Sequence, residues 1–177
     1  MTQPFEIQDH DPAQFRRQTR TSTLICVSLF ALLAMGLSTL AVQLFGSPEG
    51  SNFRWNLGGI LLGLALSILV VRLLLWQQPW MAPAVYGWRL KRALMSINNV
   101  MHKVEQGVEA GDADSMLLLR FYHLGLKHMH ELEGNQVAQD ELQPERLQHE
   151  QRMESRQLPL LVTRLDPQWL SSVKQRY

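Results

Sequence analysis

Two long apolar runs near the start of the chain constrain its fold more than any other feature. Residues 24–45 and 57–75 are almost entirely apolar, and a short polar segment separates them. A helix of about 20 apolar residues covers the hydrocarbon core of a bilayer, where only a structure with internally paired backbone amides is stable. We therefore predict two transmembrane helices joined by a short periplasmic loop over residues 46–54. The first run is too long for a cleaved signal peptide and no small-residue cleavage site follows it, so we expect an uncleaved anchor.

Basic residues flank the two runs unequally. The connecting loop has Arg54 as its only basic residue, close to Glu49, whereas the outer flanks carry Arg16, Arg17, Arg20, Arg89, Lys91 and Arg92. Because positively charged flanks stay in the cytoplasm, we predict that both termini are cytoplasmic.

Aromatic residues indicate the same topology, because indole and phenol rings favour the level of the lipid headgroups. Phe53 and Trp55 mark the outer interface, and the inner interface is marked by Trp76, Trp80, Tyr86 and Trp88. Arg72 lies inside the second run but only four residues before Trp76. We expect its side chain to reach the inner headgroups; the alternative is that it faces the interior of a helix bundle.

Charge and cysteine content exclude several classes of function. The formal net charge is +1, which argues against a nucleic-acid partner. Cys26 is the only cysteine and lies in the first run, so one chain can form neither an internal disulfide nor a zinc–thiolate cluster. No cofactor is expected.

The whole sequence predicts an all-α protein in four parts. They are a cytoplasmic N-terminal segment (1–23), the transmembrane hairpin (24–76), a cytoplasmic helical hairpin (77–134), and a polar linker with a short C-terminal helix (135–177). Asp11-Pro12 resembles a helix start that continues into the first run, and Gln77-Gln78-Pro79 predicts a break after the second.

An apolar seam after Pro83 predicts one helix that ends near Gly111. Such a seam needs a facing helix, and with only about three heptads we favour packing within the chain over an extended coiled coil. Its members alternate in spacing between four and three residues: Leu90, Leu94, Ile97, Met101, Val104 and Val108.

The next helix is predicted for residues 113–133, between a cap at Asp112 or Asp114 and a terminating Gly134. Its apolar stripe is too wide for a helical hairpin alone to cover, so a third helix, a membrane surface or another subunit must contribute, and dimerisation is the simplest source. The stripe holds Leu118, Tyr122, Gly125, Met129 and Leu132, and we expect an interaction surface at Leu117, Phe121, Leu124 and Trp169.

The C-terminal part has two segments of opposite character. Residues 136–157 are polar and form either a solvated helix interrupted at Pro144 or a flexible linker, which we favour. The last twenty residues are apolar again, and Asp166-Pro167 predicts a short helix. This segment either docks on the helical hairpin, which we favour, or binds a partner as a peptide, through Leu160, Leu165, Trp169 and Leu170.

Small residues in the second run indicate close helix packing. Gly59, Gly63 and Ser67 recur every four residues, a spacing that lets two backbones approach. We favour packing against Ala34 and Ser38 of the first run, and homodimerisation is the alternative. Neither run has Asp, Glu, His or Lys in its middle, which argues against a transporter or pump.

Histidines are the only candidates for metal binding or catalysis. The candidate set is His102, His123 and His130. On the second cytoplasmic helix, His123, His128 and His130 are spaced by five and two residues, whereas two ligands on one helical face need a spacing of three or four. We therefore predict packed or solvent-facing imidazoles, with no metal site and no catalytic residue. No G-x-S-x-G elbow or glycine-rich phosphate loop is present.

Three segments carry a resemblance to a known family: residues 52–59 (NFRWNLGG), 84–92 (AVYGWRLKR) and 119–126 (LRFYHLGL). Together they resemble an uncharacterised family of two-span inner-membrane proteins of Pseudomonas-type gammaproteobacteria, known only as a domain of unknown function. The resemblance covers about residues 5–135. It implies a bacterial inner membrane and supplies no activity or site residue.

These patterns favour a non-enzymatic, homo-oligomeric inner-membrane scaffold whose cytoplasmic helices recruit a partner. One alternative is an accessory subunit of a larger membrane complex that docks through Gly59, Gly63 and Ser67. The other is a metal sensor or enzyme that uses His102, His123 and His130.

Overall fold

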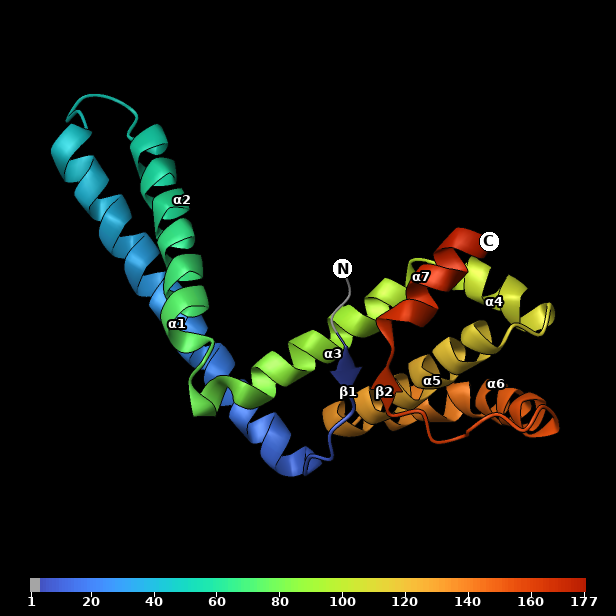
Figure 1. The fold of residues 1–177 in the computed structure, drawn as a ribbon. Coiled ribbons are helices and arrows are strands. Elements are labelled where there is room, and N and C mark those ends of the chain that lie inside the picture. Colours follow the sequence, from blue (N-terminus) through green and yellow to red (C-terminus); the bar gives the residue numbers. More distant parts are fainter. Residues whose placement is uncertain (1–3) are drawn as a thin grey trace. The chain divides into compact units, whose positions relative to one another are not determined.

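The computed structural model describes residues 4–177, which form an all-α fold of seven α-helices with one two-residue β-ladder (Figure 1). Two compact units can be distinguished. We call residues 17–85 the apolar unit, and residues 4–16 together with 86–177 the terminal unit. In chain order the elements are β1 (Phe5–Glu6), α1 (Pro12–Phe45), α2 (Phe53–Val70), α3 (Ala82–Asn98), α4 (Met101–Glu109), α5 (Ala113–Glu133), α6 (Gln136–Ser155), β2 (Arg164–Leu165) and α7 (Pro167–Arg176).

The apolar unit consists mainly of α1 and α2, which lie side by side and are joined by a short loop (Figure 1). The predicted start at Asp11-Pro12 is confirmed, since the Asp11 carboxylate accepts a hydrogen bond from the Gln14 amide at 2.6 Å and α1 continues to Phe45. The second helix begins at Phe53, inside the predicted loop. It ends in one π-helical turn, Val71–Leu75, and a 3₁₀ turn follows at Pro79–Met81. The break predicted near Pro79 is therefore confirmed.

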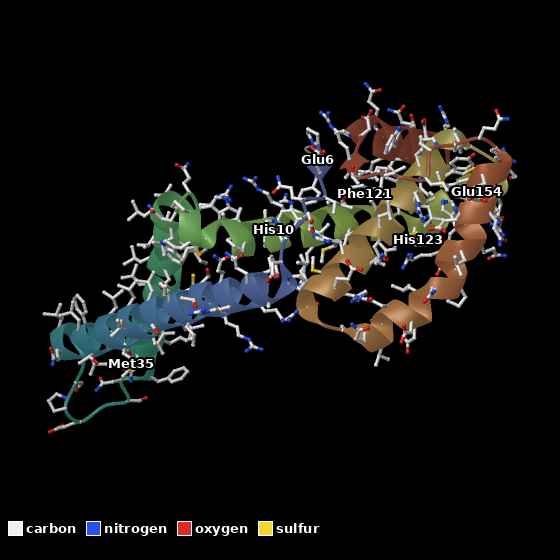
Figure 2. The ribbon with its side chains drawn as sticks, turned by 90° about the horizontal axis from the view of Figure 1, so that it is seen from below. Glu6, His10, Met35, Phe121, His123 and Glu154 are labelled. Carbon is white, nitrogen blue, oxygen red and sulfur yellow. The ribbon has the colours of Figure 1, made fainter. Side chains whose placement is uncertain are left out.

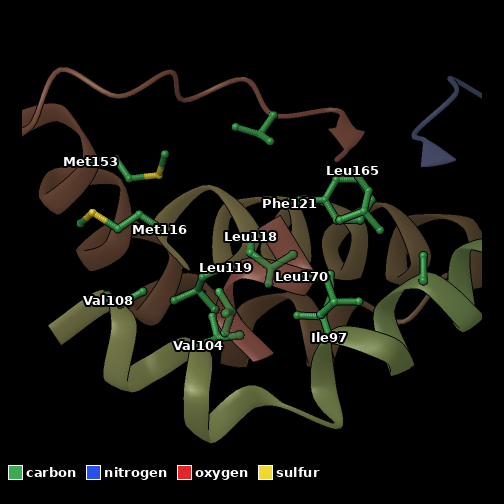
Figure 3. Packing of buried hydrophobic residues seen from close by; sticks show 13 residues of the cluster. Ile97, Val104, Val108, Met116, Leu118, Leu119, Phe121, Met153, Leu165 and Leu170 are labelled. Carbon is green, nitrogen blue, oxygen red and sulfur yellow. The ribbon is translucent and has the colours of Figure 1, made fainter. Parts of the chain in front are cut away.

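The terminal unit is built around α5, which contacts α4, α6, α7 and β2. Its core is contributed by every one of these elements, as the close-up shows (Figure 3). Phe121 and Leu118 of α5 are fully buried, together with Ile97, Val104, Met153, Leu165 and Val173.

Local capping explains the limits of α5. The Asp112 carboxylate accepts from the Ser115 amide at 3.0 Å, and the preceding Gly111 has φ +77°, which favours glycine. At the other end Gly134 has φ +75°, and its amide bonds the Glu131 carbonyl. The predicted helix over residues 113–133 is confirmed at both ends.

The predicted single helix from Pro83 to Gly111 is wrong, because the chain breaks between Asn98 and Met101. Val100 has φ −125°, and its amide donates to the Ile97 carbonyl at 2.9 Å, which closes α3 with a tight turn before α4 begins. Asn98 and Asn99 are poor helix formers in the interior of a helix. Ile97 at the end of α3 and Val104 on α4 still face one core cluster, whereas Leu90 and Leu94 of α3 face a second cluster with Tyr86 and Leu132.

The favoured linker over residues 136–157 is also wrong. The segment forms α6, a helix that runs through Pro144 without interruption and is capped by Asn135, whose side chain accepts from the Ala138 amide. Met153 and His149 are its two buried residues. An apolar face this narrow gave no helical period in the sequence, which is why the polar composition pointed to a linker.

The C-terminal segment docks on the chain itself, as favoured. Leu165, Leu170 and Val173 are buried in the core of the terminal unit, and Leu160 and Trp169 pack partly buried against it. The Asp166 carboxylate accepts from the Gln168 amide at 2.8 Å, which confirms the predicted helix start.

Candidate functional site

The contact between α1 and α2 is the first candidate site, and it is formed by small residues. A Cβ atom added to Gly59 would lie 2.4 Å from Ser38 Cα, and one added to Gly63 would lie 2.7 Å from Ala34 Cα. Ser67 is also buried, and its hydroxyl donates to the Gly63 carbonyl at 2.7 Å. The favoured packing against Ala34 and Ser38 is confirmed. The homodimer seam and accessory-subunit surface predicted at these residues are occupied within the chain.

The rest of the apolar unit exposes its large side chains. Among residues 4–177, 19 of the 25 exposed large hydrophobic residues lie on α1, α2 or the π-turn that ends α2, and Leu32 is 74% exposed. Pro12–Phe45 and Phe53–Leu75 are long and apolar enough to cross a membrane by length and composition, and the core helix of a soluble protein would be mostly buried instead. Arg72 lies over the ring of Trp76, with its guanidinium carbon 5.0 Å from the ring centroid.

A second candidate site ties the segment before α1 to the C-terminal part of the chain. Phe5 pairs with Leu165 in the β-ladder, and the Ile7 amide donates to the Thr163 carbonyl at 2.9 Å. Arg16 at the start of α1 donates to the Leu132 carbonyl at 3.2 Å. Each strand of this ladder is only two residues long, so no alternating pattern in the sequence predicts it.

Tyr86 is the centre of this second site. Its hydroxyl accepts from the Gln8 amide at 3.1 Å and donates to the Gln8 carbonyl, and burial raises its pKa above the usual value. His10 meets the ring edge-on at 4.4 Å between centroids, and Phe15 and His128 also contact it. Tyr86 was expected at the membrane interface; that prediction is wrong, since the residue is buried in the terminal unit.

The third candidate site is a polar cluster between α5 and α6, in which Arg120, His123 and His149 are buried and the glutamates that pair with them reach the surface. The Arg120 guanidinium contacts Glu150 at 2.5 Å and donates through Nε to the Leu160 carbonyl at 2.7 Å. His123, which projects from α5 (Figure 2), lies 3.3 Å from a Glu145 oxygen. The His149 ring meets the His123 ring edge-on at 5.5 Å, and its Nε2 lies 3.0 Å from the Met116 carbonyl.

Burial keeps both histidines of this cluster neutral. Desolvation lowers the pKa of His123 from 6.5 to about 4, against the opposing effect of Glu145, and burial also lowers the pKa of His149. Each ring donates from Nε2 to an oxygen. Within residues 4–177 neither Nδ1 atom has a hydrogen-bond partner, and a neutral ring needs no proton there. The cluster thus fastens the polar helix α6 to α5.

Three members of this cluster, Arg120, Glu145 and Glu150, were not found by sequence reasoning. The position of Arg120 in the sequence was a usable signal. It lies one turn before His123 inside a wide apolar stripe that is expected to be buried, and a buried arginine needs a partner. The partners of Arg120 are 30 and 40 residues away in the chain, so no local pattern connects them.

The remaining predicted residues lie mainly in the interior. Leu90, Leu94, Ile97, Val104 and Val108 are buried and Met101 is partly buried, so the seam is covered within the chain. Phe121 is fully buried and therefore is not part of an exposed interaction surface, and Leu117, Leu124 and Trp169 are partly buried against the same core. The wide stripe was expected to need a third helix, a membrane surface or another subunit, with dimerisation as the simplest source. Further helices of the chain cover it instead: α6 and α7 pack on α5, and Leu90 and Leu94 of α3 lie against Gly125.

The histidine set is not assembled into a metal centre. In the part of the chain that the structure describes, no three His, Cys, Asp or Glu side chains are placed to hold a metal ion. His102 is exposed on α4, whereas His123 is buried in the polar cluster. The structure therefore does not bring His102, His123 and His130 together as ligands.

Comparison with known proteins gives one match. Residues 5–170 match the family described as Protein of unknown function (DUF3087), and the matched region extends beyond the resemblance above to include the polar helix α6 and the C-terminal segment as far as residue 170. No match was found among curated proteins or solved structures.

Proposed function

We propose that this chain, which belongs to the DUF3087 family of proteins of unknown function, is a non-enzymatic scaffold. In this proposal α1 and α2 anchor the protein in a bacterial inner membrane, with both termini in the cytoplasm. The terminal unit is its cytoplasmic interaction module, and nucleic acid is not among its partners.

The exposed apolar surface of α1 and α2 is the observation that carries this proposal. Side chains such as Leu32, Met35 and Leu73 are at least 70% exposed, and transferring this much apolar surface into lipid is strongly favourable. The contact between the helices is made by small residues, and the Ser38 hydroxyl donates to the Asn56 side-chain oxygen at 2.9 Å.

The second site supports the hairpin topology independently of charge. Residues 4–16 precede the first apolar helix and residues 86–177 follow the second, yet both belong to one compact unit. A protein that crosses a bilayer twice returns to the side from which it started. The basic flanks assign that side to the cytoplasm.

Cysteine labelling of cells tests the topology. In a background in which Cys26 is replaced by serine, we would label Ser51→Cys in the connecting loop and Ser171→Cys on α7, both exposed positions, with a membrane-impermeant maleimide. The first should react in intact spheroplasts and the second only after lysis. Equal reactivity of both positions before lysis would contradict the two-span arrangement.

An accessory subunit of a larger complex is the second candidate function, and an exposed groove on α1 offers a place where such a complex could form. A shallow open groove on α1 exposes polar and small side chains along an otherwise apolar helix, at a place where another transmembrane helix could pack; it is lined by Leu32, Met35, Gly36, Thr39, Leu40 and Gln43. The same groove could hold a second copy of this chain, so it serves either homo-oligomer or complex.

Purification in mild detergent from native membranes distinguishes these candidates. Intact mass and the identity of co-purifying proteins should show either a homo-oligomer or a stoichiometric partner. Replacing Gly36 by Leu should weaken that association, because the larger side chain would keep the two helices apart. The fold of the single chain should not change, since no atom lies within 4 Å of a Cβ at this position. A strict monomer without partners would contradict the scaffold proposal. Stoichiometric metal in elemental analysis would revive the sensor alternative.

A further inference from the structure

Helix α3 exposes a face that combines aromatic, apolar and basic side chains. Trp88, Lys91, Arg92 and Met95 are spaced as i, i+3, i+4 and i+7, so they share one side of the helix, and all four are exposed. Trp88 is 44% exposed and Met95 63% exposed. The opposite side of α3 is buried in the terminal unit.

The charge of this face is positive and largely uncompensated. The sequence has no Asp or Glu between Glu49 and Glu105. Lys91 pairs with Glu133 at 2.6 Å, and Arg92 lies over the Trp88 ring at 5.1 Å. Within residues 4–177 neither Arg92 nor its exposed neighbour Arg89 forms an ion pair.

The face also lies close in sequence to the second apolar helix. Its residues follow Leu75, the last residue of that helix, within about 20 positions, the distance over which basic flanks act at a membrane surface. Basic clusters directly cytoplasmic of a span attract anionic lipids, and tryptophan favours the headgroup region.

We propose that this face of α3 binds the headgroups of anionic phospholipids. Arg89 and Arg92 pair with lipid phosphates, for which the planar guanidinium is suited, while Trp88 and Met95 enter the headgroup layer. The proposal rests on the membrane placement of the proposed function. A lipid surface fits better than an acidic protein, because the face mixes positive charge with apolar side chains and follows a membrane-spanning helix.

Spin labelling of the full-length protein in nanodiscs tests this inference. The Cys26→Ser background would receive a single label at Met95→Cys, in discs of phosphatidylcholine alone or mixed with phosphatidylglycerol. We expect the accessibility of the label to oxygen, relative to a water-soluble nickel chelate, to rise several-fold with phosphatidylglycerol. Leu161→Cys, at a site 80% exposed in the terminal unit, is the aqueous control.

A second variant and a second label position make the outcome decisive. The double variant Arg89→Gln and Arg92→Gln should remove the dependence on phosphatidylglycerol. A label at Leu32→Cys should be in lipid in every disc. If position 95 is aqueous in both lipid mixtures while position 32 is in lipid, the lipid-binding face is wrong and the anchor stands. If position 32 is also aqueous, the proposed function fails. A label at 95 that is immobile yet independent of lipid charge would indicate a protein contact and overturn the inference.

Discussion

At the scale of single residues, protonation of the buried histidines opposes folding. His123 and His149 are neutral in the polar cluster between α5 and α6, and burial also lowers the pKa of His128 beside Tyr86. A histidine whose pKa is lower in the folded than in the unfolded state binds fewer protons when folded. Its favourable contribution is therefore complete above pH 6.5 and is lost as the pH falls from 6.5 towards the folded pKa.

We predict that the protein loses stability between pH 7.5 and pH 5.5. For His123, with a pKa of about 4 in the folded state, the loss should be about 1 kcal/mol over this interval, because the unfolded chain takes up a proton and the folded one does not. The measurement is denaturant unfolding of the detergent-solubilised protein at both pH values.

A matched pair of variants assigns the effect. His123→Gln should reduce the difference in unfolding free energy between the two pH values by about 1 kcal/mol. His102→Gln changes an exposed histidine on α4 and should leave the difference unchanged. Equal pH responses in both variants would show that His123 is not the group responsible.

At the scale of elements, the contact between α1 and α2 depends on the absence of a Cβ atom. Gly58 and Gly59 are neighbours in α2, but only Gly59 faces the backbone of α1, and nothing lies within 4 Å of a Cβ built on Gly58. We predict that Gly59→Ala destabilises the pair by about 1–3 kcal/mol, because the helices must move apart. Gly58→Ala should be neutral. Thermal unfolding in detergent compares the two, and equal midpoints would rule out this packing.

Helix α6 packs on the terminal unit through few buried side chains, so truncating one of them should lower the stability strongly. Met153 is fully buried in the core of the terminal unit, whereas Leu147 on the same helix is 50% exposed. Met153→Ala should cost about 3 kcal/mol, through lost apolar burial and the cavity left behind. Hydrogen exchange over residues 136–155 should then rise. Leu147→Ala should leave the exchange as it is, and a similar rise in both variants would argue against Met153 as the anchor.

At the scale of the whole molecule, the segment before α1 completes the unit formed by the end of the chain. Deleting residues 2–9 removes the β-ladder and the two hydrogen bonds between Gln8 and Tyr86. We predict faster hydrogen exchange over residues 162–166 and a lower unfolding temperature. Tyr86→Phe removes only the hydroxyl and should have a smaller effect. A deletion variant as protected as the full chain would show that the ladder does not stabilise this unit.

Features encoded by neighbouring residues could be predicted from the sequence. The limits of α5 follow from Asp112 and Gly134, and the starts of α1 and α7 follow from Asp-Pro pairs. The contact of Gly59 and Gly63 with Ser38 and Ala34 was also predictable, because small residues recur at helical spacing on two helices joined by a short loop.

Features that join distant parts of the chain were decided only by the tertiary structure. Three such contacts link residues that are 30 to 160 positions apart in the chain. They are the ion pair of Arg120 with Glu150, which holds α6, the contact of Tyr86 with Gln8, and the ladder between Phe5 and Leu165. The two apolar runs by themselves determined that their helices need a nonpolar environment or extensive burial against other protein, because the hydrophobic effect depends on composition along a helix. Which polar groups are buried, and which partner satisfies each, depends on positions in space that no local period encodes.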